Sequence, residues 1–333
     1  MSDFLIRLEK FLSSRELSQN FEQLTPDAST REYFRVDGGI VCIYPEAFVA
    51  ADQSYLDVTK LFLDNGLPVA KVKDFDESLG AIMIEDFGNR ILREEMKAST
   101  PERREDLINS AIDLIPRIQA ATNAAYESGS IASRLKFDVE KLNWELNFFK
   151  EHYFTTFKKQ PLSGKDDAAI AAEFLELSQE LEDRATVLCH RDFHAANLML
   201  DADGNLKIID HQDARIGSPA YDLVSLLLDR VTELPSPAWL ASKRRRFLDG
   251  CKSLGLPLID EAAFTEEFRL QTIQRCLKAA GTFSFQSANR GKTYFIPFIK
   301  PMFRIVLRAL ENIDRFPAMK RVLENEIDSE FEV

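Results

Sequence analysis

The sequence predicts an α+β fold with two lobes, a small antiparallel β-sheet lobe followed by a larger, mainly helical lobe. Short apolar segments bounded by turn residues recur through the first 84 residues, whereas from residue 91 onward apolar residues recur at helical spacing. Within the helical part, residues 187–210 return to strand-like segments joined by tight turns. We place the boundary after residue 87, which gives one lobe of residues 1–87 and another of residues 88–333.

The first lobe opens with an amphipathic helix over residues 3–13, whose apolar side chains recur at helical spacing. Five strand-like segments follow, with a helix over residues 48–65 between the third and the fourth. The segments comprise residues 21–24, 33–36, 40–44, 69–75 and 81–84. Turn residues such as Asp37-Gly38-Gly39 separate them, as expected for neighbouring antiparallel strands.

The second lobe reads as a series of helices. The first begins at Ser99-Thr100-Pro101, and we expect Pro116 to kink it. The others cover residues 138–157, 168–183, 219–228, 238–252, 261–281, 291–313 and 316–326. Asp222 is the odd residue in an otherwise apolar helix, and a buried carboxylate needs hydrogen-bond donors. We expect backbone amides of the loop around residue 190 to serve, which makes Asp222 a structural support. Arg275 and Lys278 precede Gly281, where we expect that helix to end. They complement the helix dipole or face an anionic or polyhydroxylated ligand.

The stretch from Cys189 to Asp213 carries the chemistry. His190-x-Asp192 and Asn197 fall in one loop between two strands, and a hairpin with an Asp-Gly turn signal brings Asp210 back beside them. One carboxylate can accept the proton of an attacking hydroxyl, while an amide oxygen and a second carboxylate hold Mg²⁺ against nucleotide phosphates. Asp and Asn are also common in ordinary turns. Kinase catalytic loops, however, carry these residue types in this order and spacing, which favours phosphoryl transfer.

A kinase also needs groups that hold the nucleotide. The polar turn over residues 25–31 has no glycine-rich loop, but backbone amides with Ser29, Thr30, Arg31 or Arg35 could donate to phosphate. Glu85 and Phe87 lie where the lobes meet and are candidates for the adenine side. An ordinary polar hairpin and a solvated linker are the alternative interpretations of these two segments.

The composition limits the classes of partner. A net charge of -12 argues against a nucleic-acid or acidic-membrane binder and leaves a neutral or cationic small molecule. The four cysteines form no Cys-x-x-Cys motif, which fits a reducing compartment. Neither a secretion signal nor an apolar run of membrane-spanning length is visible, so we expect a cytoplasmic protein. The oligomeric state is not indicated.

With these residues placed, the chain resembles the aminoglycoside phosphotransferase-like kinases, which share the two-lobed protein-kinase-like fold. Five segments carry a narrower resemblance, namely Asp27 to Arg35, His190 to His194, Asp210-x-Gln212-Asp213, Tyr221-Asp222-Leu-Val-Ser and Gln274-Arg275-x-Leu-Lys278-x-x-Gly281-x-Phe283. In these segments the chain resembles the bacterial N-acetylmuramate/N-acetylglucosamine anomeric kinases.

The resemblance implies roles by position. Asp192 would be the catalytic base, and Asn197 and Asp210 would hold Mg²⁺. His194 and Asp213 would lie near the acceptor sugar, and Arg31 or Arg35 near the phosphates of ATP. His190 and Asp222 would brace the loop.

Two positions depart from the usual kinase pattern. The strand over residues 40–44 has no lysine to pair with the nucleotide phosphates, so an arginine would have to supply that charge. His211 stands where phenylalanine is usual after the metal-binding aspartate, which either alters packing or places a titratable group beside the metal.

The sequence therefore predicts an enzyme, an ATP- and Mg²⁺-dependent small-molecule kinase that phosphorylates the anomeric hydroxyl of an N-acetylated amino sugar. An aminoglycoside or choline-like alcohol is the alternative acceptor. A nucleotide-binding pseudokinase, which the missing lysine and His211 would permit, is the alternative of another class.

Overall fold

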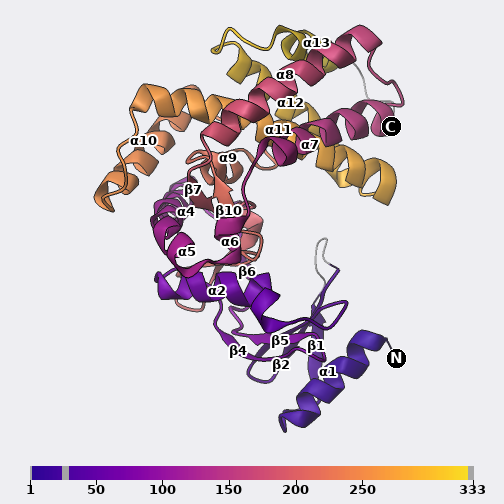
Figure 1. Cartoon of the computed structure of the whole chain (residues 1–333), viewed down its shortest axis with the longest axis vertical. Coiled ribbons are helices and arrows are strands. Elements are labelled where there is room, and N and C mark those ends of the chain that lie inside the picture. The colour runs from indigo at the N-terminus through magenta and orange to yellow at the C-terminus, as the bar shows by residue number, and fades with distance from the viewer. Residues whose placement is uncertain (1, 25–29, 329–333) are drawn as a thin grey trace. The chain divides into compact units, whose positions relative to one another are not determined.

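The computed structural model describes residues 2–24 and 30–328 (Figure 1). Its chain divides into two compact units. The first unit contains the described residues up to Leu107, together with Asn123–Ala132 and Ala195–Ala214. The second contains Ile108–Thr122, Ser133–His194 and the described residues from Arg215 onward. The division after residue 87 stays a prediction.

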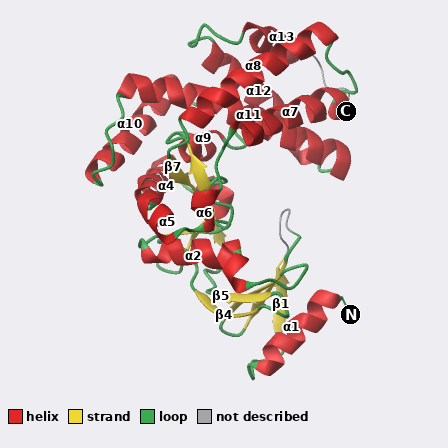
Figure 2. Cartoon of the chain, viewed as in Figure 1, coloured by secondary structure: helices red, strands yellow, loops and turns green. Residues whose placement is uncertain are grey.

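A five-stranded antiparallel sheet forms the centre of the first unit (Figure 2). All five predicted strands are present. They are β1 (Phe21–Leu24), β2 (Glu32–Val36), β3 (Gly39–Ile43), β4 (Val72–Asp76) and β5 (Ala81–Ile84). Their order in the sheet is β1-β2-β3-β5-β4, so β5 lies between β3 and β4. Gly39 permits the close approach of β3 and β5, because a Cβ at this position would collide with the carbonyl oxygen of Ile84.

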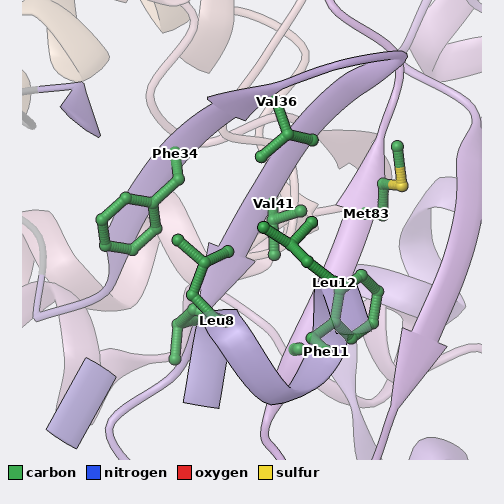
Figure 3. Packing of buried hydrophobic residues seen from close by; sticks show 9 residues of the cluster. Leu8, Phe11, Leu12, Phe34, Val36, Val41 and Met83 are labelled. Atoms are coloured by element: carbon green, nitrogen blue, oxygen red, sulfur yellow. The ribbon is translucent and has the colours of Figure 1, made fainter. Parts of the chain in front are cut away.

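The predicted N-terminal helix, α1 (Asp3–Ser14), covers one face of this sheet (Figure 3). Its apolar stripe meets inward-facing side chains of β2, β3 and β5. The cluster consists of Leu8, Phe11, Leu12, Phe34, Val36, Val41, Ile43, Ala81 and Met83. Leu8 and Phe11 are fully buried, and each such side chain contributes about 1.5–3 kcal/mol by leaving water.

The helix predicted over residues 48–65 is shorter than expected. A 3₁₀ turn, Ala50–Asp52, comes first, and α2 then covers Ser54–Asp64. The Gln53 side chain accepts a hydrogen bond from the backbone N–H of Tyr55 and so caps the start of α2.

A second, three-stranded sheet in the first unit has the order β6-β8-β9. Its strands are β6 (Arg90–Ile91), β8 (Leu198–Leu200) and β9 (Leu206–Ile208), and a 3₁₀ turn, Ala195–Asn197, precedes β8. The short helices α3 (Leu92–Ala98), α5 (Thr122–Ser128) and α6 (Ile131–Arg134) lie wholly or partly in this unit, and α4 (Pro101–Ala120) begins in it and ends in the second unit.

The second unit is mainly helical. Its helices are α7 (Val139–Lys150), α8 (Gly164–Asp183), α9 (Tyr221–Leu228), α10 (Pro237–Ser253), α11 (Glu261–Arg290), α12 (Ile299–Leu310) and α13 (Pro317–Asp328). A π-helical segment, Glu151–Phe157, continues α7, and a 3₁₀ segment, Thr293–Phe298, precedes α12. Two short strands, β7 (Val187–Cys189) and β10 (Arg215–Gly217), pair antiparallel. None of the helices in the described part of the chain is both long and apolar enough to cross a membrane.

The longest helix, α11, corrects one prediction. Gly281 does not end it, because the helix continues to Arg290 and ends at Gly291, which has a left-handed backbone (φ +67°). Gly281 instead lies inside α11 where the helix crosses α7, and a Cβ there would lie 2.6 Å from the Cα of Phe149. The glycine is therefore required by helix packing and not by a turn.

Candidate active site

In the first unit, the hairpin of β8 and β9 brings Asn197 and Asp210 together. The backbone N–H of Ile209 donates to the carbonyl oxygen of Asn197 at 3.1 Å, so the residues that flank the hairpin are held side by side. The turn between the strands contains Gly204, whose φ of +82° favours glycine. As a result, the side-chain amide of Asn197 donates to Oδ2 of Asp210 at 3.3 Å.

Asp210 occupies an unusual backbone conformation, with φ at +62°. Such a conformation costs a non-glycine residue free energy and is often found at functional sites. Nε2 of Gln212 donates to its Oδ1 at 2.8 Å, and Nη2 of Arg31 lies 3.7 Å from the same oxygen. The carboxylate is held from one side while its side chain remains 42% exposed.

The donor set at this hairpin fits Mg²⁺. An amide oxygen of Asn197 and the carboxylate of Asp210 are hard ligands, and Mg²⁺ usually takes one or two carboxylates and completes its shell with water and phosphate oxygens. The described residues contain no group of three or more His, Cys, Asp or Glu side chains suited to a metal. The site therefore differs in kind from a closed, all-protein metal centre.

His211, next to Asp210, is a core residue. Its side chain is 1% exposed, and its Nε2 lies 2.7 Å from Oγ1 of Thr59 on α2. Its ring stacks on Phe62, with centroids 5.3 Å apart, and lies 5.0 Å from the ring of Tyr55. The sequence left two roles for His211, in packing or as a titratable group beside the metal. Its burial and contacts agree with the packing role, because the imidazole connects the segment after β9 to α2.

The arginines expected near the phosphates have different surroundings. The guanidinium of Arg31 lies over the rings of Tyr33 and Tyr44, at 5.8 and 5.5 Å from their centroids, and faces Asp210. Arg35 instead donates to Asp86 at 2.6 Å.

Further partners tie Arg35 to the segment after β5. Its Nη2 donates to Oδ1 of Asn89 at 2.7 Å and to the Gly88 carbonyl at 3.2 Å, and its Nη1 donates to Glu22 at 3.2 Å. Arg35 thus braces the segment over residues 86–89, whereas Arg31 accompanies the metal-binding candidate Asp210.

The remaining candidates in the first unit are spread along it. Thr30 is exposed, and Ser29 lies outside the described residues. Glu85 and Phe87 line a surface hollow of about 530 Å³ that also involves Leu200 and Lys207. The Lys207 ammonium lies 5.2 Å from the centroid of the Phe87 ring. Asp213 is half-buried in the turn that follows Gln212.

In the second unit, Asp222 organises the loop that carries Asp192. The buried carboxylate at the start of α9 accepts the backbone N–H of His190 at 2.7 Å and that of Arg191 at 3.1 Å. Arg191 has φ at +85°, so these two bonds hold a sharp bend in place. Burial raises the pKa of Asp222, and the two amides and the neighbouring His190 oppose that effect.

Cations surround the carboxylate of Asp192. Nζ of Lys278 lies 3.6 Å and Nη1 of Arg275 3.7 Å from Oδ1, and Nε of Arg191 lies 3.5 Å from Oδ2. Burial by itself would raise the pKa of Asp192, but Lys278, Arg191 and Arg275 outweigh it and hold that pKa far below its usual range. His194, two residues on, is half-buried and donates its backbone N–H to the Asp192 carbonyl at 3.0 Å.

The sequence reasoning missed Glu145. This α7 side chain is 2% exposed, accepts a hydrogen bond from Nε2 of Gln274 at 2.8 Å, and lies 3.5 Å from Nζ of Lys278. Lys278 therefore stands between two carboxylates, Glu145 and Asp192. A glutamate on the buried face of an aromatic helix was the available signal, because such a group needs partners.

The structure assigns Asp192 and His194 to the second unit, and Asn197, Asp210 and Asp213 to the first. The chain passes from one unit to the other between His194 and Ala195, inside the four residues that separate Asp192 from Asn197. Each unit by itself therefore brings together part of the predicted set: Asn197 with Asp210 and Arg31 in one, and Asp192 with Asp222, Arg275 and Lys278 in the other.

Comparison with known proteins places this chain among kinases and phosphotransferases. The model of the phosphotransferase enzyme family matches residues 20–257. An N-acetylmuramate/N-acetylglucosamine kinase of Neisseria meningitidis serogroup B is 30% identical over 91% of this chain and 90% of its own length. A kinase of the same name from Pseudomonas aeruginosa is 25% identical over 85% of this chain and 82% of its own length.

Solved structures confirm the protein-kinase-like fold class. The GDP complex of an aminoglycoside 2'-phosphotransferase aligns with a TM-score of 0.60 at 13% identity, over 94% of this chain and 99% of that one. A choline kinase from Streptococcus pneumoniae aligns with a TM-score of 0.56 at 16% identity, over 91% and 97% of the two chains. The family match covers well over half of the chain, and this protein belongs to the phosphotransferase enzyme family, as an enzyme that transfers a phosphoryl group to an alcohol.

Proposed function

We propose that this protein transfers the γ-phosphoryl group of ATP, with Mg²⁺, to the anomeric hydroxyl of an N-acetylated amino sugar. The observation that carries the proposal is the environment of Asp192, a carboxylate kept ionised by Lys278, Arg191 and Arg275 in a family of phosphotransferases. The relatives named N-acetylmuramate/N-acetylglucosamine kinases, similar over most of their length, support the choice of acceptor.

In this proposal Asp192 accepts the proton of the attacking hydroxyl and orients its oxygen. Asn197 and Asp210 would hold Mg²⁺, which when bound neutralises charge on the nucleotide phosphates. His190 and Asp222 support the loop, because the two backbone N–H bonds to Asp222 fix the position of the residue before Asp192. His194 and Asp213 are proposed to contact the acceptor.

The nucleotide side draws on the first unit. Ser29, Thr30, Glu85 and Phe87 are proposed nucleotide contacts. Arg31 is the better candidate for the cation that replaces the missing strand lysine, because its guanidinium faces Asp210. Arg35 already donates to Asp86, Asn89 and Glu22, so we assign it the support of the segment over residues 86–89.

The chemistry of Asp192 favours an anomeric hydroxyl. A carboxylate with a strongly lowered pKa is a weak base, so it suits a hydroxyl that is acidic already. The hydroxyl of a sugar hemiacetal is more acidic than that of an ordinary alcohol. Most of the rate acceleration would then come from positioning and from electrostatic stabilisation.

The same surroundings disfavour the alternative acceptors. Aminoglycosides and choline are cationic, and like charges brought close together repel strongly in a partly desolvated site. Lys278, Arg275 and Arg191 all lie within 3.7 Å of Asp192. A neutral or anionic acceptor avoids this repulsion.

We further propose that the protein acts in the cytoplasm, where ATP and Mg²⁺ are supplied.

An acceptor panel tests this function. The full chain would be incubated with ATP and Mg²⁺ and with N-acetylglucosamine, N-acetylmuramate, kanamycin or choline, and phosphorylated products would be followed by phosphorus NMR. We expect turnover of the N-acetylated sugars and little of the two cationic acceptors. Turnover of kanamycin or choline alone would refute the proposed acceptor, and nucleotide binding without any turnover would favour a pseudokinase.

A further inference from the structure

The cations around Asp192 exceed the negative charge that they face. Lys141, Arg191, Arg275 and Lys278 lie within 3.8 Å of two carboxylates, Glu145 and Asp192. Asp222 and Asp229 each add a negative charge that interacts with Arg275. Asp222 is already bonded to the backbone N–H groups of His190 and Arg191, and Asp229 is paired with Arg230 at 3.8 Å. A positive surplus therefore remains in a chain whose net charge is -12.

The contacts of Arg275 and Lys278 leave donors available. Both stand 3.6–3.7 Å from Asp192, well beyond the roughly 2.7–2.9 Å of a direct charge-assisted hydrogen bond. Nε of Arg275 is buried and has no hydrogen-bond partner among the described residues, although the side chain is nine-tenths buried. An unsatisfied guanidinium donor at such a site costs free energy unless an acceptor reaches it.

The two cations are fixed in place by helix packing. Nη1 of Arg275 donates to the hydroxyl of Tyr221 at 3.2 Å, and Nζ of Lys278 lies 3.5 Å from the buried Glu145. Gly281, one turn after Lys278, permits the close contact of α11 with α7 that brings these side chains together. Cations that are held before a ligand arrives bind it at a smaller entropic cost.

We propose that Arg275 and Lys278 form a carboxylate-binding subsite for the acceptor, beside the catalytic Asp192. The inference rests on the proposed function and refines it, because it makes an acidic N-acetylated amino sugar a better acceptor than its uncharged counterpart. A carboxylate matches both a guanidinium fork and an ammonium, whereas a hydroxyl or an amide gains less from them. The charge of the phosphoryl group has separate partners in the proposed function, namely Mg²⁺ and Arg31.

The test pairs a change in the protein with a change in the acceptor. N-acetylmuramate carries a lactyl carboxylate, and its carboxamide has nearly the same shape but is uncharged, with an NH2 donor in place of one acceptor oxygen. We would measure kcat/KM for both acceptors with the natural protein, Lys278→Gln, Lys278→Arg and the surface control Lys252→Gln, which removes a positive charge from an exposed position of α10.

The natural protein should prefer the acid over the amide by about 10-fold or more, the usual worth of a charge-assisted hydrogen bond. Lys278→Gln should abolish most of this preference, Lys278→Arg should keep much of it, and Lys252→Gln should leave it unchanged. Because Lys278 also faces Asp192, the Lys278→Gln variant will have a lower kcat for both acceptors. That loss cancels in the ratio of kcat/KM for the acid to kcat/KM for the amide. An acid-to-amide ratio that Lys278→Gln does not change would overturn the inference.

The acceptor comparison also stands without the variants. If Lys278→Gln does not fold, the natural protein must still show a higher kcat/KM for the acid than for the amide. Equal kcat/KM for acid and amide would overturn the carboxylate subsite and leave the proposed function intact. Turnover of neither acceptor, nor of N-acetylglucosamine, would overturn the proposed function itself.

Discussion

Asp192, the proposed catalytic base, combines a fixed position with a constant charge. The loop before it is held by Asp222, and its pKa is kept low because Lys278, Arg191 and Arg275 outweigh the effect of burial. It will therefore stay ionised throughout the physiological pH range, and the pH dependence of turnover will not report its titration.

Asp192→Asn removes the proton acceptor and keeps the size of the side chain. We expect kcat to fall by about 10²–10⁴-fold, the usual contribution of a general base, with the nucleotide affinity nearly unchanged. Turnover assays and calorimetric titration with nucleotide measure the two quantities. Asp183→Asn, at the exposed end of α8, is the matched control and should behave like the natural protein. An Asp192→Asn variant with near-normal turnover would contradict the assignment.

The surroundings of Glu145 predict that the free energy of unfolding depends on pH. Burial would raise the pKa of Glu145, but Lys278, Arg275 and Lys141 outweigh burial and hold that pKa below its ordinary value. The folded state therefore favours the ionised form, and its contribution is complete above the unfolded pKa and is lost as pH falls through the folded one. We expect Glu145→Gln to be less stable than the natural protein at pH 7. The gap between their melting temperatures should narrow steadily below about pH 4.5, and a constant gap from pH 7 to pH 3 would contradict this account.

At the residue scale, the sequence could indicate Asp192, Asn197 and Asp210 because their spacing is local and a hairpin turn is readable. Glu145 could not be found in this way. Its partners, Gln274 and Lys278, belong to a helix far along the chain, and only the packing of α7 on α11 brings them together.

Among the elements, α11 shows what a glycine can mean in a helix. The sequence suggested a helix end at Gly281, since glycine commonly follows the last turn. Packing decides otherwise, because α7 approaches so closely that no side chain fits between Gly281 and the backbone of Phe149. A local pattern cannot distinguish these two uses of glycine.

A substitution pair tests this contact. Gly281→Ala should lower the free energy of unfolding by about 1–3 kcal/mol, because its Cβ would lie 2.6 Å from a backbone atom that cannot easily move. Gly164→Ala, at the start of α8 with nothing within 4 Å of its Cβ, should be neutral or slightly stabilising. Urea denaturation measures both, and equal stability of the two variants would contradict the close packing of α7 and α11.

The anchoring of His211 to α2 is a second property of the elements. Thr59→Val keeps the shape of the Thr59 side chain and removes the hydroxyl that lies 2.7 Å from Nε2 of His211. Leaving a buried polar atom without this partner should cost about 1–3 kcal/mol of unfolding free energy. Thr265→Val, whose hydroxyl bonds within its own helix at an exposed position, serves as the control. If Thr59→Val proves as stable as Thr265→Val, the imidazole does not depend on this bond.

For the molecule as a whole, the α+β class with an antiparallel sheet and a mainly helical remainder was readable from the spacing of apolar residues. The order of the strands in the sheet could not be predicted, because β5 lies between β3 and β4. The paired strands β3 and β5 are separated in the sequence by α2 and β4, so no local pattern indicates their pairing. The strand-like stretch over residues 187–210 also contributes to two sheets, since β7 pairs with β10 while β8 pairs with both β6 and β9.

Net charge was a poor guide to the acceptor. A total of -12 left a cationic substrate open, yet the carboxylate of Asp192 faces Lys278, Arg275 and Arg191. Electrostatic interaction with a bound molecule depends on charges within a few ångströms, because more distant surface charges are screened by salt. The charge around Asp192 is therefore positive although the net charge of the chain is negative. We expect the charge around Asp192 to decide which acceptor binds.

The site of phosphorylation on the sugar tests the central claim most directly. The full chain would be incubated with ATP, Mg²⁺ and N-acetylglucosamine labelled with ¹³C at the anomeric carbon, and the product would be observed by carbon and phosphorus NMR. We expect the labelled carbon signal to be split by phosphorus and the reducing end to disappear. A product phosphorylated at another hydroxyl, with an unsplit anomeric signal and an intact reducing end, would contradict the account.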